Sequence, residues 1–284
     1  MSKIIELGDD GFNKLNELGI NYTLRNDLAS KLQQSELDKR DWVVIPYEFT
    51  GGEYSARVNP ARISYCPAVE KAGKELCINY LNTGKDSLGR EFVGNNTWGD
   101  SIMLNVSMGV RAITPREKVD YLHLLVLGSQ DKADVYDTSG KRIDSKLCEK
   151  YLLDSIEKTS PGRAEWIDAE FKASGSERYI LFKHNFLTKK GDLIGKKERI
   201  EEDTLMKGHF GDFSEISFDD WVKNHTRQGL PRANVKRGDF SYTNPREDTS
   251  VIRMFANSGG TGLFFSSSKS LRAPSLGIRS CESI

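Results

Sequence analysis

The C-terminal segment, residues 251–279, places the strongest constraint on how this chain folds. Its two ends, 251–255 and 276–279, have the apolar pattern of strands. Between them lie nineteen residues, 257–275, of which nine are Ser or Gly and none is acidic. Such a composition is typical of a flexible linker, but a linker has no reason to end in a strand-like sequence. We therefore expect a long functional loop held at both ends by a sheet.

Side chains in this segment are of the kinds that binding surfaces use. Ser, Gly and Asn provide adaptable hydrogen bonding, and the rings of Phe264 and Phe265 provide large, rigid contact area. Lys269 and Arg272 are the only charged residues of the loop. Phe264, together with an exposed Phe255, favours a protein or another aromatic-tolerant surface over a bare anion as the ligand.

The composition of the whole chain excludes several classes of protein. With 284 residues and 37% hydrophobic content, the chain is long enough to bury a substantial core. Lys plus Arg equals Asp plus Glu, 41 each, so we expect no nucleic-acid partner. No apolar leader follows Met1, and no segment approaches the roughly twenty apolar residues of a membrane span. We expect synthesis in the cytoplasm without a signal peptide or membrane insertion.

The cysteines and the acidic residues predict neither a disulfide nor a bound metal. No CxxC motif and no Cys/His metal spacing is present, which favours unpaired thiols in a reducing compartment. No clustered Asp/Asn loop supports a bound Ca²⁺, so no cofactor is predicted. The four cysteines are Cys66, Cys77, Cys148 and Cys281.

No catalytic constellation can be read from the sequence. The chain contains no HExxH, GxSxG or phosphate-binding glycine loop. Asp168 and Glu170 would share one face of a strand, but nothing supplies the partner that a catalytic carboxylate pair needs. We therefore expect no enzyme. The histidines are scattered along the chain: His123, His184, His209 and His225.

Hydrophobic periodicity predicts short helices and strands along most of the chain. Residues 1–85 are expected to form an N-terminal elaboration, helical over 1–40 and then in short strands, before a main domain over 86–284. The predicted strands are 42–47, 54–65, 77–81, 163–171, 179–184 and 240–242. Helices are predicted over 145–156 and 218–222, the second capped by Ser217, and the charged run 189–202 is expected to be a solvated excursion.

Two consecutive helices are predicted between residues 96 and 126. Asn96 or Thr97 caps the first, and Gly109 ends it. Thr114 caps the second, and Glu117, three residues after the cap, completes a capping box.

This pair of helices resembles the formylglycine-generating-enzyme (sulfatase-modifying factor) type of C-type lectin fold. In that family a Trp-x-Asp-Ala helix precedes an Arg-Leu-Pro-Thr-x-x-Glu-Trp helix. Trp98-Gly99-Asp100-Ser101 and Arg111-Ala112-Ile113-Thr114-Pro115-Arg116-Glu117 match these motifs, with Ala112-Ile113 in place of Leu-Pro and Lys118 in place of the tryptophan. The resemblance implies an α+β fold in which two helices pack on a small antiparallel sheet with long loops.

Residues 90–280 are also similar to variable proteins of diversity-generating retroelements, the archaeal and archaeal-virus kind. The similarity rests on 162–171, 229–231, 238–242 and a terminal VxRxxAxSGxxxL…LGIR pattern. It implies that residues from about 251 to 279 are rewritten by adenine-directed mutagenesis and form a ligand-binding face. The implied framework is Val251, Arg253, Ala256, Ser258, Gly259, Leu263, Leu276, Gly277, Ile278 and Arg279. The implied variable, ligand-binding positions are Phe255, Asn257, Gly260, Gly262, Phe264, Ser266, Ser267, Ser268, Lys269, Leu271 and Arg272.

The resemblance implies display on a virion or cell surface and a protein or glycan ligand on a target surface. Two alternatives stay open at this point: a structural virion or adhesin component without a variable site, and an oxidase of the formylglycine-generating type. The oxidases use a pair of cysteines near the C-terminus, where this chain has only Cys281. The sequence does not predict the ligand or the oligomeric state.

Overall fold

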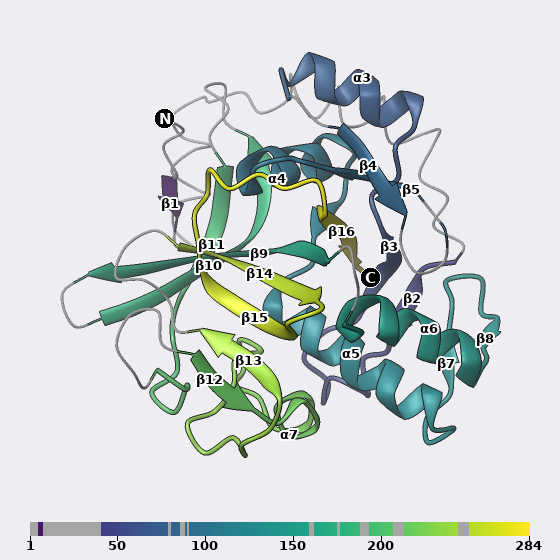
Figure 1. The fold of residues 1–284 in the computed structure, drawn as a ribbon, viewed down its shortest axis with the longest axis vertical. Helices are drawn as coiled ribbons and strands as arrows, with labels where there is room; N and C mark the ends of the chain where they lie inside the picture. Colours follow the sequence, from purple (N-terminus) through teal and green to yellow (C-terminus); the bar gives the residue numbers. More distant parts are fainter. Residues whose placement is uncertain are drawn as a thin grey trace.

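The fold is mixed α+β, with five helices and a large, mostly antiparallel sheet in the part of the chain that the structure describes (Figure 1). A computed structural model describes residues 5–7, 41–78, 81–85, 89, 91–158, 162–174, 177–187, 193–206, 213–243 and 250–284. Within these ranges, no helix has both the length and the apolar character needed to cross a bilayer.

Eight strands form the main path of the sheet, in the order β1-β11-β10-β9-β14-β15-β13-β12. The pairs β1–β11 and β13–β15 are parallel, and the other neighbours on this path are antiparallel. The strands are β1 (Ile5–Leu7), β9 (Arg163–Ser174), β10 (Glu177–Leu187), β11 (Leu193–Arg199), β12 (Phe213–Ile216), β13 (Phe240–Thr243), β14 (Ser250–Asn257) and β15 (Gly260–Ser267).

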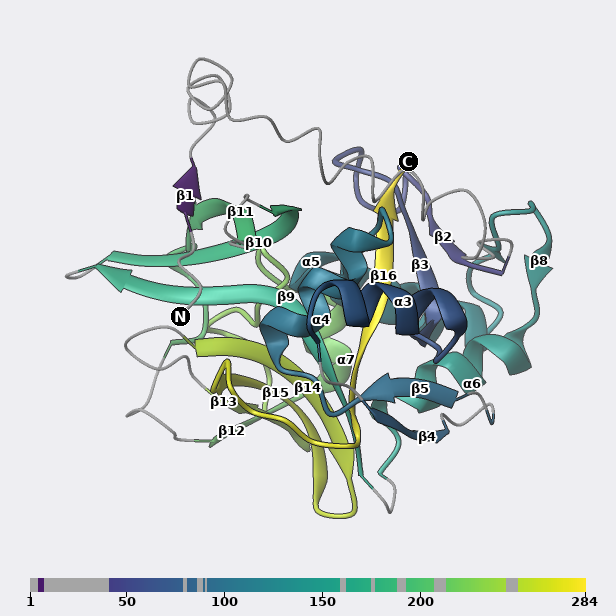
Figure 2. The same cartoon turned by 90° about the horizontal axis from the view of Figure 1, so that it is seen from above.

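The C-terminal strand β16 (Leu276–Ser283) connects the centre of the sheet with strands from the first half of the chain (Figure 2). It begins parallel to β9 and then pairs with β3 (Ala56–Arg62) and β6 (Arg111–Ala112), while β2 (Val43–Ile45) extends the sheet beyond β3. Strands β2 and β3, from before residue 86, therefore share a sheet and a core with the rest of the described chain. Two further hairpins are β4 (Leu81–Lys85) with β5 (Glu91–Gly94), and β7 (Val135–Tyr136) with β8 (Arg142–Ile143).

The helix caps predicted from the sequence are confirmed. Helix α4 (Trp98–Ser107) begins with a capping box between Thr97 and Asp100, and α5 (Pro115–Ser129) begins with one between Thr114 and Glu117. Gly109, at a φ of 73°, follows the end of α4. The other helices are α3 (Pro67–Glu75), α6 (Ser145–Ile156) and α7 (Phe218–Lys223), the last capped by Ser217 as expected.

Two cores lie on opposite faces of the central strand β9. Trp166 belongs to the core that contains Trp98 and Ile102 of α4, here called the α4-side core. The next residue, Ile167, belongs to the core that contains Leu122 of α5, here called the α5-side core. Successive side chains of a strand point to opposite faces, so β9 separates the two cores. The indole of Trp98 donates to the Ile167 carbonyl at 2.9 Å and ties α4 to β9.

Four predicted elements differ, in whole or in part, from the structure. Residues 260–267, expected as loop, form β15, because Gly and Ser hide the alternation of apolar side chains that identifies a strand. Residues 193–199, expected to be solvated, form β11, whose charged side chains lie at exposed and half-buried positions. The third strand begins at Leu81, because Cys77 has a φ of 55° and ends the preceding turn. Of the helix expected over 1–40, residues 5–7 are strand β1, and the rest lies outside the described residues.

Candidate ligand-binding face

The segment proposed from sequence to bind a ligand begins as a β-hairpin. Strands β14 and β15 pair antiparallel, with Asn257 opposite Gly260 at the tip. The side-chain oxygen of Asn257 accepts hydrogen bonds from the backbone N–H groups of Gly259 at 2.9 Å and Gly260 at 3.1 Å. Asn257 therefore stabilises the turn and is itself exposed to solvent.

Three side chains form a cluster on the face of this hairpin that looks toward the α4 side. In the register of β14 and β15, Arg253 lies opposite Phe264, and Phe255 lies opposite Gly262. The rings of Phe255 and Phe264 are 4.3 Å apart at an interplanar angle of 67°, and the Arg253 guanidinium carbon is 5.2 Å from the centre of the Phe264 ring. All three residues are half-buried. We call Arg253, Phe255, Phe264 and the tip residue Asn257 the hairpin face.

The other face of the hairpin is buried in the α5-side core. Met254, Leu263 and Phe265 each have 2% or less of their surface exposed, so the strict alternation of β-strands separates core residues from the hairpin face. Phe264 and Phe265 are thus consecutive aromatic residues with opposite environments. Phe265 packs edge-on against Tyr242 and belongs to the core.

Three of the small residues expected at variable positions lie within the sheet. Gly260, Gly262 and Ser267 are buried. A Cβ at Gly262 would lie 2.2 Å from the backbone oxygen of Ser241 on the neighbouring strand β13, so this position requires glycine. At Gly260 the nearest heavy atom to such a Cβ would be 3.9 Å away, which leaves room for a side chain. The side chain of Ser266 lies outside the described residues.

The loop between β15 and β16 lies on the N-terminal end of α4 (Figure 1), and both of its cations are engaged there. Arg272 bonds the Asp100 carboxylate at 3.0 Å. Lys269 bonds the buried Glu170 at 2.5 Å, and its ammonium lies 5.7 Å from the Trp98 ring centre. Half-buried Leu271 packs against the α4-side core, while Ser268 is exposed. This loop is therefore anchored to the scaffold by its own side chains.

The two carboxylates considered from sequence as a catalytic pair each have a partner that the sequence did not reveal. Asp168 accepts from His184, through Nδ1 at 2.5 Å and through the backbone N–H at 2.9 Å. Glu170 is neutralised by Lys269. All three of Asp168, Glu170 and His184 have 0% of their surface exposed. They act here as buried, paired groups that hold β9, β10 and the loop together.

Arg279 holds the far end of the segment. Its guanidinium, with 0% exposure, donates to Glu165 at 2.7 Å and to Asp154 at 2.8 Å, and also to the Pro60 carbonyl. Lys118, at the position where the related motif has tryptophan, bonds the other oxygen of Glu165 at 2.5 Å. Burial alone would raise the pKa of Glu165, but Arg279 and Lys118 lower it to about 2. Burial lowers the pKa of Lys118 to about 8, against the pull of Glu165.

The cysteines are all free, as predicted. Cys281 is fully buried, with its sulfur 3.6 Å from Oε2 of Glu117, and burial together with this carboxylate raises its thiol pKa. Burial likewise raises the pKa of Cys148 to about 11. A cysteine-dependent oxidase needs a thiol that is deprotonated and that reaches its substrate. The raised pKa of Cys281 opposes the first requirement, and its burial opposes the second. In the described ranges, no three His, Cys, Asp or Glu side chains are grouped to hold a metal ion.

Arg253 is the residue of the hairpin face that sequence reasoning assigned to the framework. Its guanidinium makes no ion pair with any described residue, and its buried Nε has no hydrogen-bond partner. Burial without a neighbouring carboxylate lowers its pKa. The signal that could have identified it is its spacing of two from Phe255, which places both side chains on the same face of a strand.

Comparisons of the chain with protein-family models, with curated proteins and with solved structures found no match.

Proposed function

We propose that this chain is a ligand-binding protein of C-type lectin type, and that the hairpin face together with the exposed part of the following loop binds the ligand. We further propose that this region is the diversified segment of a retroelement variable protein displayed on a virion or cell surface. The scaffold would then be the sheet and the two cores that hold both ends of the segment in place.

The cluster of Arg253, Phe255 and Phe264 is the observation that carries this proposal. A half-buried guanidinium costs desolvation free energy, and no carboxylate among the described residues offsets it at Arg253, whose contact there is with the Phe264 ring. A ligand carboxylate at Arg253 would offset that cost, and the two rings beside it offer the rigid apolar area typical of binding hot spots. The preferred ligand is therefore an acidic protein surface with apolar side chains beside its carboxylate.

The division between scaffold and face supports a replaceable binding surface. Asn257 bonds the turn, and the ring of Phe264 packs on that of Phe255, which also contacts the edge of the α4-side core. None of the three is fully buried, so their side chains can change with little loss of buried core area. Three of the implied variable positions have structural roles instead. Gly262 leaves space for the neighbouring strand β13, and Lys269 and Arg272 form ion pairs that hold the loop to Glu170 and Asp100. We propose that the functional variation is concentrated at Phe255, Asn257, Phe264 and Ser268.

A selection experiment tests the binding role. One library of the full chain randomises Phe255, Asn257, Phe264 and Ser268. A matched library randomises four exposed positions elsewhere, Lys141 between β7 and β8 and three on α6: Lys146, Glu149 and Lys150. Both are displayed and selected against one folded acidic protein, ovalbumin. We expect binders from the hairpin-face library, weakened by Arg253→Gln, and few from the other. Equal yields, or insensitivity to Arg253→Gln, would assign the segment a structural role.

The gene's surroundings test the retroelement origin separately. A near-copy of the 3′ coding region that differs at adenines, next to a reverse transcriptase gene, is expected. A single invariant copy in related genomes, without such a gene, would contradict the proposed diversification. The proposed binding role would still be tested by the selection experiment.

A further inference from the structure

A preformed cleft lies on the opposite, α5 side of the sheet, away from the hairpin face. Its volume is about 180 Å³, and its walls come from the start of α5, strands β10 and β11, residues 53–54 and residues 227–228. Ile180, Phe182 and Tyr54 provide the apolar part of the lining. This volume is below the roughly 300–1,000 Å³ of sites for drug-sized molecules, so the cleft suits a smaller ligand.

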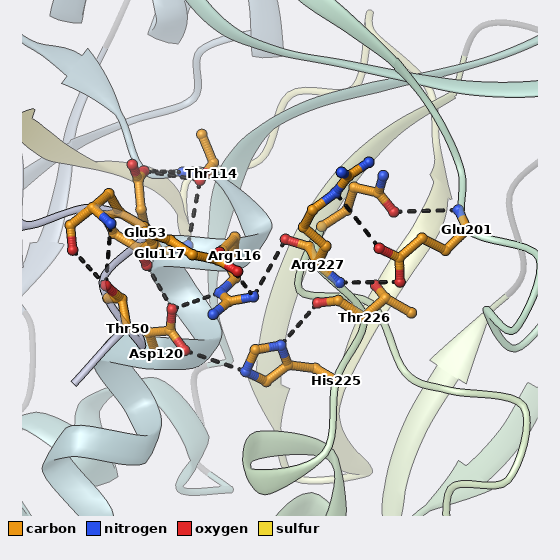
Figure 3. Close-up of polar contacts among 12 residues, drawn as sticks. Thr50, Glu53, Thr114, Arg116, Glu117, Asp120, Glu201, His225, Thr226 and Arg227 are labelled. Atoms are coloured by element: carbon orange, nitrogen blue, oxygen red, sulfur yellow. Dashed lines mark hydrogen bonds and ion pairs between the residues drawn. The ribbon is translucent and has the colours of Figure 1, made fainter. Parts of the chain in front are cut away.

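The walls of the cleft are fixed by polar contacts among described residues (Figure 3). Asp120 of α5 accepts from Tyr54 at 2.6 Å and from Arg116 at 2.7 Å, and contacts His225 at 3.2 Å. Arg116 also reaches the Arg227 carbonyl on the opposite wall at 3.5 Å. The cleft therefore exists before any ligand binds, which reduces the ordering cost of binding.

Lys183 enters this cleft because β10 is irregular at that point. Its φ is 54°, a left-handed value that a lysine rarely adopts, and the register of β10 with β11 shifts between Phe182 and Phe186. In a regular strand Phe182 and Lys183 would point to opposite faces, yet both line the cleft. Within the same irregular stretch, His184 lies on the α4 side, where its ring meets Trp98 edge-on. Such bulges commonly redirect a side chain beside a functional site.

The charges of the cleft leave Lys183 as its available cation. Glu117 is paired with Arg111, and Glu198 lies 3.1 Å from Lys196. The remaining acidic side chain, Glu53, is 3.7 Å from Arg116. The cation of Arg227 lies 3.6 Å from Glu201. Within the described residues, half-buried Lys183 makes no direct ion pair or hydrogen bond, and its charge acts on Glu117 only at longer range, where it helps to lower the pKa of that carboxyl.

We propose that this cleft is a second binding site, specific for a small carboxylate with a short apolar tail. The carboxylate bonds the ammonium of Lys183, and the tail packs on Ile180, Phe182 and the ring of Tyr54. This assignment is independent of the hairpin face, because the two sites lie on opposite sides of the sheet and share no residue.

Titration of the full chain with 3-methylbutanoate, followed by two-dimensional NMR, tests the site. We expect saturable shifts at Ile180, Phe182 and Lys183. The uncharged isostere 3-methylbutanamide and the variant Lys183→Gln should each bind at least about tenfold more weakly, as expected when a charge-assisted hydrogen bond is lost. Lys150→Gln, which removes an exposed lysine of α6, is the matched control and should bind normally.

Any of three outcomes with the first set of measurements would overturn the proposal: equal binding of acid and amide, unchanged binding by Lys183→Gln, or tighter binding of inorganic phosphate at the same residues. Lys183→Gly guards against misfolding of the glutamine variant, because glycine adopts a φ of 54° without strain. Folded Lys183→Gly with undiminished affinity for 3-methylbutanoate would likewise exclude the site. Phe264→Ala should leave this binding unchanged.

Discussion

Arg279 on β16 donates its Nε–H to Oε2 of Glu165 on β9 across 2.7 Å, and solvent reaches almost none of either side chain. The bond joins the strand at the end of the proposed binding segment to the centre of the sheet. Because Asp154 and Lys118 share the same buried network, the position of β16 is fixed by several charges at once.

Replacement of Arg279 by leucine should destabilise the fold severely. The change leaves Glu165 and Asp154 buried with fewer cations, and breaking a buried ion pair from one side typically costs about 3–5 kcal/mol. Arg57→Leu is the matched control. Arg57 of β3 pairs with Glu282, which lies on β16 near its end, and 27% of the Arg57 side chain is exposed. That variant should lose about 1 kcal/mol or less. Urea unfolding measures both, and equal losses would contradict the assignment of Arg279 as the anchor.

The stability of the fold should fall steeply at acid pH through Glu165. Its pKa in the fold is about 2, below the value of 4.5 for an unperturbed glutamate. A carboxylate with a lowered folded pKa binds fewer protons in the fold than when unfolded. Its contribution is therefore complete above pH 4.5 and lost as the pH falls toward 2. The carboxyl ¹³C shift of Glu165 should stay constant from pH 6 to 3.5, whereas a midpoint near 4.5 would show that the network leaves it unperturbed.

Two glycines of β15 should respond in opposite ways to alanine. Gly262→Ala forces a Cβ to within 2.2 Å of the Ser241 carbonyl, and overpacking of this kind costs about 1–3 kcal/mol. Gly260→Ala meets no atom closer than 3.9 Å and should be neutral or slightly stabilising. Thermal unfolding of the two variants distinguishes them. A tolerated alanine at Gly262 would mean that β13 does not lie against β15 as described.

Glycine at position 183 should stabilise the chain. A left-handed conformation costs a non-glycine residue about 1–2 kcal/mol, so Lys183→Gly should gain up to about 1 kcal/mol after the entropy of glycine is included. Lys197→Gly, in the neighbouring strand β11, should lose about 0.5–1 kcal/mol, because Lys197 has no positive φ to relieve. Urea midpoints measure the pair. Destabilisation of both variants alike would mean that Lys183 carries no strain.

Local signals explain which parts of the fold could be predicted from the sequence. The caps of α4 and α5 depend on residues three apart, Thr97 with Asp100 and Thr114 with Glu117. The sequence predicts the second capping box in full, and it narrows the cap of α4 to Asn96 or Thr97. Strand β15 was missed because a Gly/Ser-rich strand has no apolar alternation and depends on its neighbours β13 and β14 for its conformation.

The site could be predicted only in outline. Phe255 and Phe264 were identified as surface contacts by residue type, but the loop cations were not recognised as anchors, because Glu170 and Asp100 are distant in sequence from Lys269 and Arg272. The absence of an ion-pair partner for Arg253 among the described residues, and of a hydrogen bond at its Nε, is likewise a property of the folded chain and not of any local pattern.

The most direct test of a replaceable face on a fixed scaffold compares Phe264 and Phe265. These consecutive residues share a side chain but lie on opposite faces of β15, the first half-buried and the second with 0% exposure. Urea unfolding of the alanine variants should give a loss of about 3–5 kcal/mol for Phe265→Ala. The loss for Phe264→Ala should be about 1 kcal/mol, the worth of an aromatic pair contact. Losses of equal size, or a larger loss at Phe264, would contradict the division between binding face and scaffold.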